Sequence, residues 1–394
     1  MTTGAFPLKM LRLMTSVAKP SLDRFTKALA VAGAFVALGC GDGQPNPSVG
    51  AERVWVHQGE AQGTTYTVKY VSGDSVPQSA LDACLEEVDV EMNAWRPSST
   101  LSRFNAHSSV DEAFSFADEF GVWQDVWHIS SEVNDWSGGA FDVTVGPLMK
   151  LWGFRMERRD EVTPSMVDSV RSFARFALDM VQFVPKASHS DTLAGTAALL
   201  KGDARVELDF NAVAQGYTVD AMAEVLLDRG VKDMMVELGG EVKCLGSNVH
   251  GLPWRIAIDR PQAEGRTLQA ILPMNNMSIC TSGNYRKTRV VNGQRFSHTL
   301  DPRTGFPVVH NLLSATVVAP DAAYADACAT VCMVLGPEEG RRWIARMNEE
   351  GVPLEALFIM DGNNGEFAYW STPVLESQLE WLEPLDKYDP LVVE

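Results

Sequence analysis

The chain has 394 residues, of which 45% are apolar and 21% charged. This is the composition of an ordinary globular protein, long enough to bury a large core in one big domain or two smaller ones. The formal net charge of −18 argues against nucleic acid or an anionic membrane surface as a general partner. An anionic nucleotide would therefore need local help from Arg side chains, backbone N–H groups or a metal ion.

The N-terminal segment has the form of an export signal. Residues 28–39 are twelve uncharged, mostly apolar residues, and five basic residues precede them. A run of this length is too short to span a bilayer and is typical of a signal peptide. Cys40 follows Leu38 and Gly39 as in a bacterial lipobox, although the leucine lies one place closer to the cysteine than is usual. The pattern favours lipid modification of Cys40, with plain cleavage nearby as the alternative.

The expected domain organisation follows from this signal. We assign residues 1–40 to a lipoprotein signal peptide, 41–53 to a polar Gly/Pro tether, 54–370 to one folded domain and 371–394 to an acidic C-terminal tail. Five cysteines remain after Cys40. Their number is odd and none forms a Cys-x-x-Cys pair, so we expect buried free thiols rather than a metal cluster.

Helix and strand patterns alternate irregularly through the folded domain. Apolar residues at helical spacing predict helices over residues 81–92 and 122–136. Residues 212–229 also have a helical pattern, with Asn211 as a possible N-cap. Short apolar runs predict strands over residues 66–71, 234–238, 255–258, 268–272, 277–280, 313–318 and 357–359. The implied class is mixed α+β.

Residues 296–308 are the most informative stretch for function. Four polar residues, His298, Asp301, Arg303 and Thr304, lie within seven positions around a Pro–Gly turn. Asp before Pro favours a turn, and the glycine that follows can supply a positive φ. Catalytic loops present polar groups in this way, but a solvated surface turn would have the same pattern. His298 could be a general base or only a turn residue, and the sequence leaves both open.

A second group of polar residues lies at the start of the helix expected over residues 212–229. Asp209 comes just before it, and Ala212 and Gln215 lie in its first turn. A helix start offers unpaired N–H groups that suit a polar ligand. Asp209 and Asn211 could instead simply cap the helix.

A third group contains the best metal ligands. Asp326 and Thr330 lie four apart in a stretch with a helical pattern, so both face the same side. A carboxylate and a hydroxyl are hard oxygen ligands, suited to Mg²⁺ rather than to zinc. Two ligands are too few, so carbonyls, water or a substrate phosphate must complete the shell. Most helical pairs of this kind bind nothing, so the spacing alone does not decide.

In their order along the chain, these motifs resemble the ApbE-type FAD:protein FMN transferases. The motifs are residues 63–66, 101–105, 139–148 with 151–154, 208–217, 281–286, 296–308 and 326–330. The resemblance covers roughly residues 60–335 and implies a T-fold-like single catalytic domain. It also implies a Mg²⁺-dependent enzyme that splits FAD as its substrate, transfers FMN to a Thr or Ser hydroxyl of a partner protein and releases AMP.

The resemblance assigns roles to single residues. The residues expected to border the flavin are Gln62, Trp95, Ala140, Phe141, Asp142, Asp209, Gln215 and Leu300. Trp95 and Phe141 are the rings that could stack on the isoalloxazine. The expected Mg²⁺ ligands are Asp326, Thr330 and the backbone carbonyl of Ala212. His298 and Asp301 are the candidate catalytic residues.

Three positions depart from the pattern of the family. Gln62 replaces the methionine usual before Gly-Thr, and Gln215 stands where many relatives carry Lys or Glu. A neutral amide can hydrogen-bond but cannot form an ion pair. Ala329 stands where many relatives carry another acidic residue, so one side-chain ligand of the metal is missing.

The resemblance also implies partners and a location. The acceptors would be flavin-accepting subunits of membrane redox complexes, for example sodium-pumping or Rnf-type oxidoreductases. The enzyme would lie on the periplasmic side of the bacterial inner membrane, held by its lipid anchor. Two other functions would use the same pocket: a periplasmic FAD pyrophosphatase giving FMN and AMP, and a non-catalytic FAD-binding lipoprotein.

Overall fold

The computed structural model describes residues 53–155, 161–185, 196–262, 265–284, 288–291, 294–362 and 366–388. The described residues belong to one compact unit, Pro47–Glu394. The expected signal peptide, Cys40 and nearly all of the tether lie outside the described residues. Among the residues that are described, no helix is both long and apolar enough to cross a bilayer.

A nine-stranded sheet organises the fold, with strand order β1-β2-β6-β7-β10-β15-β16-β17-β19. Its pairs are antiparallel except for β17 and β19. The strands are β1 (Arg53–Ala61), β2 (Thr64–Ser72), β6 (Asp233–Leu238), β7 (Glu241–Leu245), β10 (Met277–Gly283), β15 (Leu312–Ala319), β16 (Glu355–Asp361), β17 (Phe367–Ser371) and β19 (Asp386–Lys387). Gln62 and Gly63, with φ of 50° and 75°, form the two-residue turn between β1 and β2, a conformation that suits the twist of a hairpin.

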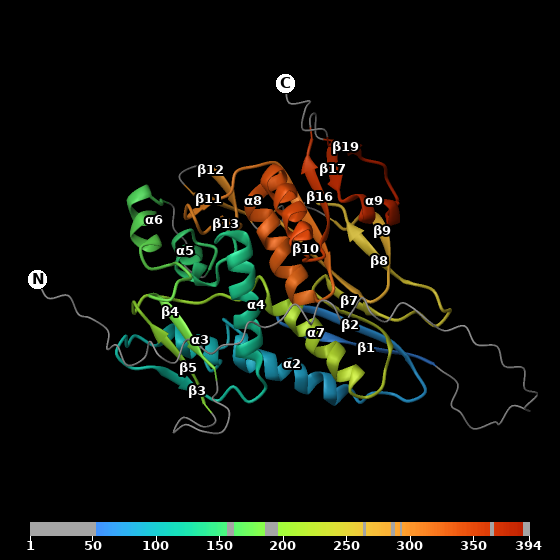
Figure 1. Ribbon diagram of the computed structural model, residues 1–394, viewed down its shortest axis with the longest axis horizontal. Coiled ribbons are helices and arrows are strands. Elements are labelled where there is room, and N and C mark those ends of the chain that lie inside the picture. The colour runs from blue at the N-terminus through green and yellow to red at the C-terminus, as the bar shows by residue number, and fades with distance from the viewer. Residues whose placement is uncertain are drawn as a thin grey trace, which may run out of the picture. The chain divides into compact units, whose positions relative to one another are not determined.

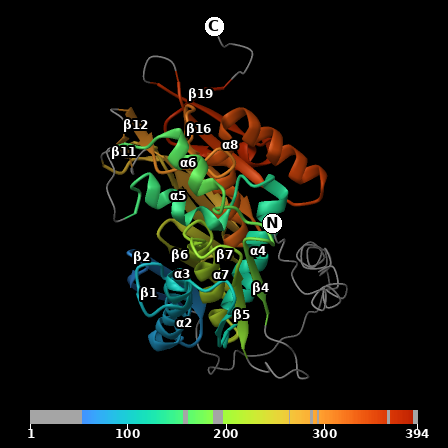
Figure 2. The same ribbon diagram turned by 90° about the vertical axis from the view of Figure 1, so that its left-hand side faces the viewer.

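Four helices lie over one face of this sheet (Figures 1 and 2). They are α2 (Gln78–Met92), α4 (Val122–Ser137), α7 (Ala214–Leu227) and α8 (Ala322–Glu349). The helix α8 packs on β10 and β15, and α7 packs on β6 and β7, while α2 contacts α7 and α4 contacts α8. Their apolar faces and the sheet enclose the largest hydrophobic core.

The opposite face of the sheet is covered by a small three-stranded sheet. Its strands are β8 (Trp254–Asp259), β9 (Leu268–Met274) and β18 (Glu380–Trp381). Along β16, Leu357 and Ile359 belong to this second core, while Ala356, Phe358 and Met360 belong to the first. Successive side chains on a strand point to opposite faces. Both faces of β16 are buried, and its sequence is therefore one continuous apolar run.

The remaining elements lie toward one end of the helical layer. They are β3 (Phe114–Phe116), β4 (Val181–Val184) and β5 (Ala197–Lys201), which form a sheet, with α3 (Thr100–Ala106), η1 (Val143–Val145), α5 (Gly146–Leu151), α6 (Pro164–Arg171), β11 (Thr288–Val291), β12 (Gln294–Ser297), β13 (Leu300–Asp301) and β14 (Phe306–Pro307). The short helix α9 (Pro373–Gln378) lies elsewhere, on β16 and in the second core. A third hydrophobic cluster joins α5 and α6 to Leu300 of β13.

The mixed α+β class predicted from the sequence is confirmed, and each of the seven predicted strands is present. All five cysteines after residue 53 are buried and free of disulfides, as expected. Two details differ. The helix α7 begins at Ala214 with Val213 in the N-cap position, so Asn211 is not its cap. The segment expected as an acidic tail contributes α9, β18 and β19, which pack on the two sheets.

Candidate functional site

The starts of α7 and α8 meet at Gly216. A Cβ at this position would lie 2.3 Å from the carbonyl oxygen of Ala322, so only glycine permits so close an approach. The backbone N–H of Gly216 donates to Oδ2 of Asp326 at 3.2 Å. This crossing therefore places the predicted metal ligand Asp326 against the first turn of α7, the turn that Ala212 and Gln215 border.

A buried ion cluster holds the start of α8 in place. Lys243 of β7 donates to Oδ1 of Asp220 at 2.7 Å and to Oδ1 of Asp321 at 3.0 Å. The two carboxylate oxygens of Asp220 also accept the backbone N–H groups of Ala322 and Ala323, at 3.0 and 2.9 Å. A side chain of α7 thus caps α8 across 102 positions of sequence.

The oxygen ligands predicted for Mg²⁺ lie on one side of α8. Asp326 is buried, and burial raises the pKa of its carboxyl to about 7. The hydroxyl of Thr330, one turn further on, is 3.3 Å from that of Ser282 on β10. Glu241, at the start of β7, is a second buried carboxyl; burial and the charge of Asp326 raise its pKa to about 8. Two buried carboxyls and a half-buried hydroxyl supply oxygen ligands of the kind that a divalent cation prefers, so the residues fit Mg²⁺.

Sequence reasoning missed Glu241. It directly follows Gly239 and Gly240, which turn the chain from β6 into β7 with φ of 65° and 108°. An acidic residue after two glycines, at the end of a short apolar strand, is the signal that could have found it.

The tip of the β1–β2 hairpin reaches the same place. The side-chain amide of Gln62 donates to the hydroxyl of Thr218 on α7 at 2.8 Å. A Cβ at Gly239 would lie 3.0 Å from Nε2 of Gln215 and 3.2 Å from Oε2 of Glu241. The structure therefore brings Gln62, Gln215 and the carboxyl pair around the first turn of α7.

Two predicted flavin-bordering carboxylates are held by protein groups. Asp209 accepts from Arg155 at 2.5 Å and from the backbone N–H of Asn211 at 3.0 Å. Asp142 accepts the N–H groups of Thr144 and Phe176 at 2.7 and 3.0 Å, although burial still raises its pKa. Both carboxylates are used to shape the surrounding loops. Arg155, the ion-pair partner of Asp209, was not found from the sequence.

The loop of residues 296–308 has the predicted turn. Asp301 lies on β13, residues 302–305 turn, and Gly305 has a φ of 77°. The carboxylate of Asp301 accepts from Nε and an Nη of Arg303 at 2.9 and 3.0 Å, so it is engaged rather than available as a free base. The indole of Trp152 donates to the Gly305 carbonyl at 2.8 Å and anchors the turn. His298 is half-buried directly after β12, and its role as a base stays a prediction.

A polar cavity of about 260 Å³ lies between this loop and Asp142. It is lined by Asn134, Gly139, Asp142, Arg171, Ala174, Arg175, Phe176, Pro302 and Arg303. Three arginines line this cavity, and each is paired with a carboxylate: Arg171 with Asp168, Arg175 with Asp179 and Arg303 with Asp301. The volume is below that of a typical site for a whole small molecule, so it suits part of a nucleotide.

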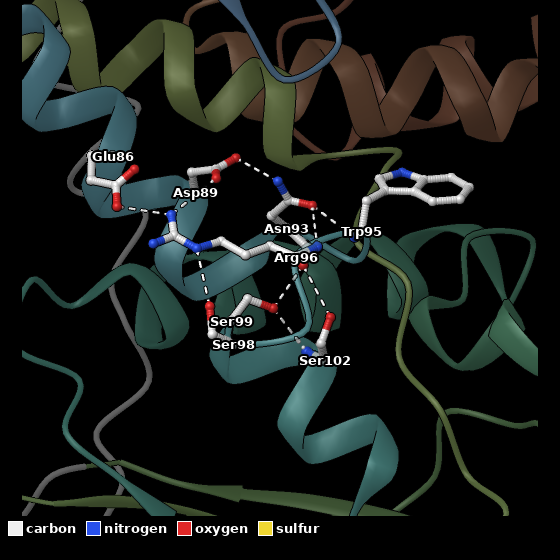
Figure 3. A network of polar contacts seen from close by, with 8 residues as sticks. All are labelled: Glu86, Asp89, Asn93, Trp95, Arg96, Ser98, Ser99 and Ser102. Carbon is white, nitrogen blue, oxygen red and sulfur yellow. Dashed lines mark hydrogen bonds and ion pairs between the residues drawn. The ribbon is translucent and has the colours of Figure 1, made fainter.

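Trp95 is presented on a loop fixed by hydrogen bonds (Figure 3). The side-chain oxygen of Asn93 accepts the backbone N–H groups of Trp95 and Arg96 at 2.7 and 3.0 Å. The hydroxyls of Ser99 and Ser102 donate to the Asn93 carbonyl, and Arg96 pairs with two acidic side chains of α2. The indole is 63% exposed and projects away from this network.

The other predicted flavin-bordering residues are buried. Ala140 is 1%, Phe141 3% and Leu300 5% exposed. The Phe141 ring packs in the largest core. Of the two rings expected to stack on the isoalloxazine, Trp95 is therefore the one that faces solvent.

A sheet covered by helices, with oxygen ligands where the starts of α7 and α8 meet, is the arrangement expected of an enzyme of the ApbE class. The sequence model of the ApbE family matches residues 62–355, and the chain belongs to this family. The resemblance stated from the motifs is thereby confirmed.

Relatives share most of the length of the chain. A protein named FAD:protein FMN transferase from Haemophilus influenzae is 36% identical over 288 residues, covering 71% of this chain and 80% of that protein. One of the same name from Escherichia coli K12 is 32% identical over 366 residues, covering 90% and 97%. The structure of the flavin transferase ApbE from Vibrio cholerae superposes with a TM-score of 0.67 at 32% identity, covering 83% of this chain and 99% of that one.

Proposed function

We propose that this chain transfers FMN from FAD to a Ser or Thr hydroxyl of an acceptor protein, releases AMP and depends on Mg²⁺. The pyrophosphate bond of FAD breaks, a phosphoester forms between the FMN phosphorus and the acceptor oxygen, and the hydroxyl proton passes to a base. The observation that carries the proposal is the set of oxygen donors at the crossing of α7 and α8, in a chain whose relatives are named for this transfer.

Each residue of the site has its own proposed role. Asp326, Thr330 and the carbonyl of Ala212 would hold Mg²⁺, which would neutralise the pyrophosphate when bound. Trp95 offers its exposed ring to the isoalloxazine. His298 is the proposed base, because Asp301 is engaged by Arg303.

The test uses purified protein, FAD, Mg²⁺ and a candidate acceptor from a flavin-bearing membrane redox complex. We expect the acceptor to gain the mass of FMN, and the Ala variant of its target hydroxyl to gain none. Free FMN and AMP without labelled acceptor would instead indicate a pyrophosphatase, and unchanged bound FAD a flavin-binding lipoprotein. Equal labelling of the Ala variant would contradict the proposed transfer.

Location is part of the proposal. The apolar run over residues 28–39 and the lipobox-like Leu38-Gly39-Cys40 support export and lipid anchoring on the periplasmic side of the inner membrane. Cys40→Ala should release the protein from the membrane fraction or stall its processing. Unprocessed wild-type protein in the cytoplasm would contradict this location.

A further inference from the structure

Glu241 is a buried carboxyl with an unsatisfied atom. Its residue exposure is 8%, and its Oε2 is shielded from solvent with no hydrogen-bond partner among the described residues. Leaving a polar atom of a carboxyl unpaired in the interior costs free energy comparable to a lost hydrogen bond or more. Such an atom in a native protein calls for a partner, which can be a water, a proton or an ion.

The neighbouring basic group does not neutralise Glu241. Lys243 lies two residues along β7 and therefore points to the same face, toward α7 and α8. Its ammonium is already shared by Asp220 and Asp321 at 2.7 and 3.0 Å. The charges that act on Glu241 are those of two other carboxyls, Asp326 and, more weakly, Glu237. Two like charges in a buried space require a cation or a proton between them.

Oε2 of Glu241 lies near the side chain of Gln215, a residue in the first turn of α7. Both this oxygen and Nε2 of Gln215 lie within 3.2 Å of the position that a Cβ on Gly239 would take. The next residue, Gly216, donates its N–H to Oδ2 of Asp326. Gln215 and Gly216 are consecutive, so the same turn of α7 lies beside both carboxyls.

We propose that Glu241 is a ligand of the cation held by Asp326. The inference rests on the proposed function and deepens it, because Glu241 supplies the carboxylate that Ala329 cannot. Two carboxylates, the Thr330 hydroxyl and the Ala212 carbonyl give four oxygen ligands. Mg²⁺ takes six, so two positions are left for water or phosphate oxygens. A site with two carboxylates binds a divalent cation before FAD arrives.

The experiment measures Mn²⁺ binding to nucleotide-free protein by the electron paramagnetic resonance signal of the free ion. The variants are Glu241→Gln and Asp326→Asn, each close in shape to the wild type. Asp228→Asn is the matched control, since it removes one negative charge at an exposed position just after α7 and leaves the surroundings of Glu241 unchanged. We expect Glu241→Gln and Asp326→Asn each to weaken Mn²⁺ binding at least about tenfold, and the control to weaken it much less.

Thermal unfolding gives a second readout. Added Mn²⁺ should raise the unfolding temperature of wild type and control but not of the two ligand variants. Without metal the ligand variants should unfold no lower than wild type, because each removes one of two like charges from a buried space. If Glu241→Gln binds Mn²⁺ as tightly as wild type while Asp326→Asn binds it more weakly, Glu241 is not a ligand, and the metal site at Asp326 stands. Unchanged Mn²⁺ binding in Asp326→Asn would overturn both this role and the metal site of the proposed function. FMN transfer, measured separately, distinguishes the loss of a ligand from failure of the transferase proposal.

Discussion

Asp220→Ala should destabilise the protein by about 3 kcal/mol, because it breaks a largely buried ion pair. Asp220 accepts Lys243 and the first two N–H groups of α8, so its loss leaves three donors without this acceptor. Breaking a buried ion pair by removing one partner costs about 3–5 kcal/mol, and losing a helix cap costs about 1 kcal/mol. The side chain of Asp220 is 18% exposed, and Lys243 would still pair with Asp321 in the variant. We therefore expect a loss at the lower end of the range for a buried pair, about 3 kcal/mol.

The assay is equilibrium unfolding in urea, followed by circular dichroism. Asp220→Asn should lose less than Asp220→Ala, because its amide oxygen can still accept one helix N–H. The matched control is Asp228→Ala, an exposed position just after the same helix, which should stay within about 0.5 kcal/mol of wild type. A loss below about 1 kcal/mol for Asp220→Ala would refute the view that this cluster fixes the start of α8.

Three further results are expected. Trp95→Ala should weaken FAD binding roughly 5- to 150-fold, as stacking on a ring contributes about 1–3 kcal/mol; an unchanged Kd by fluorescence titration would contradict it. Gly216→Ala should destabilise the fold by about 1–3 kcal/mol because its Cβ meets the Ala322 carbonyl at 2.3 Å, and a neutral effect on urea unfolding would argue against this crossing. Burial lowers the pKa of His310, so wild type should lose stability relative to His310→Gln as pH falls below 6.5, the ordinary value; a pH-independent difference would disprove it.

Local features of the fold could be predicted because neighbouring residues determine them. The turn before Gly305 follows from Asp-Pro and a glycine that tolerates positive φ, and the structure has it. Asp326 and Thr330 share a helix face because they are four apart, and both lie on α8 as expected. Strands were also predicted correctly where a short apolar run was bounded by turns.

Features that depend on contacts between distant residues could not be predicted. Asp220 caps a helix 102 positions away, and Asp209 pairs with Arg155 54 positions away. No spacing rule connects such residues. The predicted start of α7, Ala212, was two residues too early. Asn211 has the side chain of a typical N-cap, but the backbone becomes helical only after Val213.

The first strand sets the distance between the start of the described chain and the site. β1 has nine residues, and at about 3.4 Å per residue it extends about 30 Å. Arg53 stands at one end, and Gln62, which contacts α7, follows the other. If the chain is anchored through Cys40, an acceptor must bring its hydroxyl to the far end of this strand.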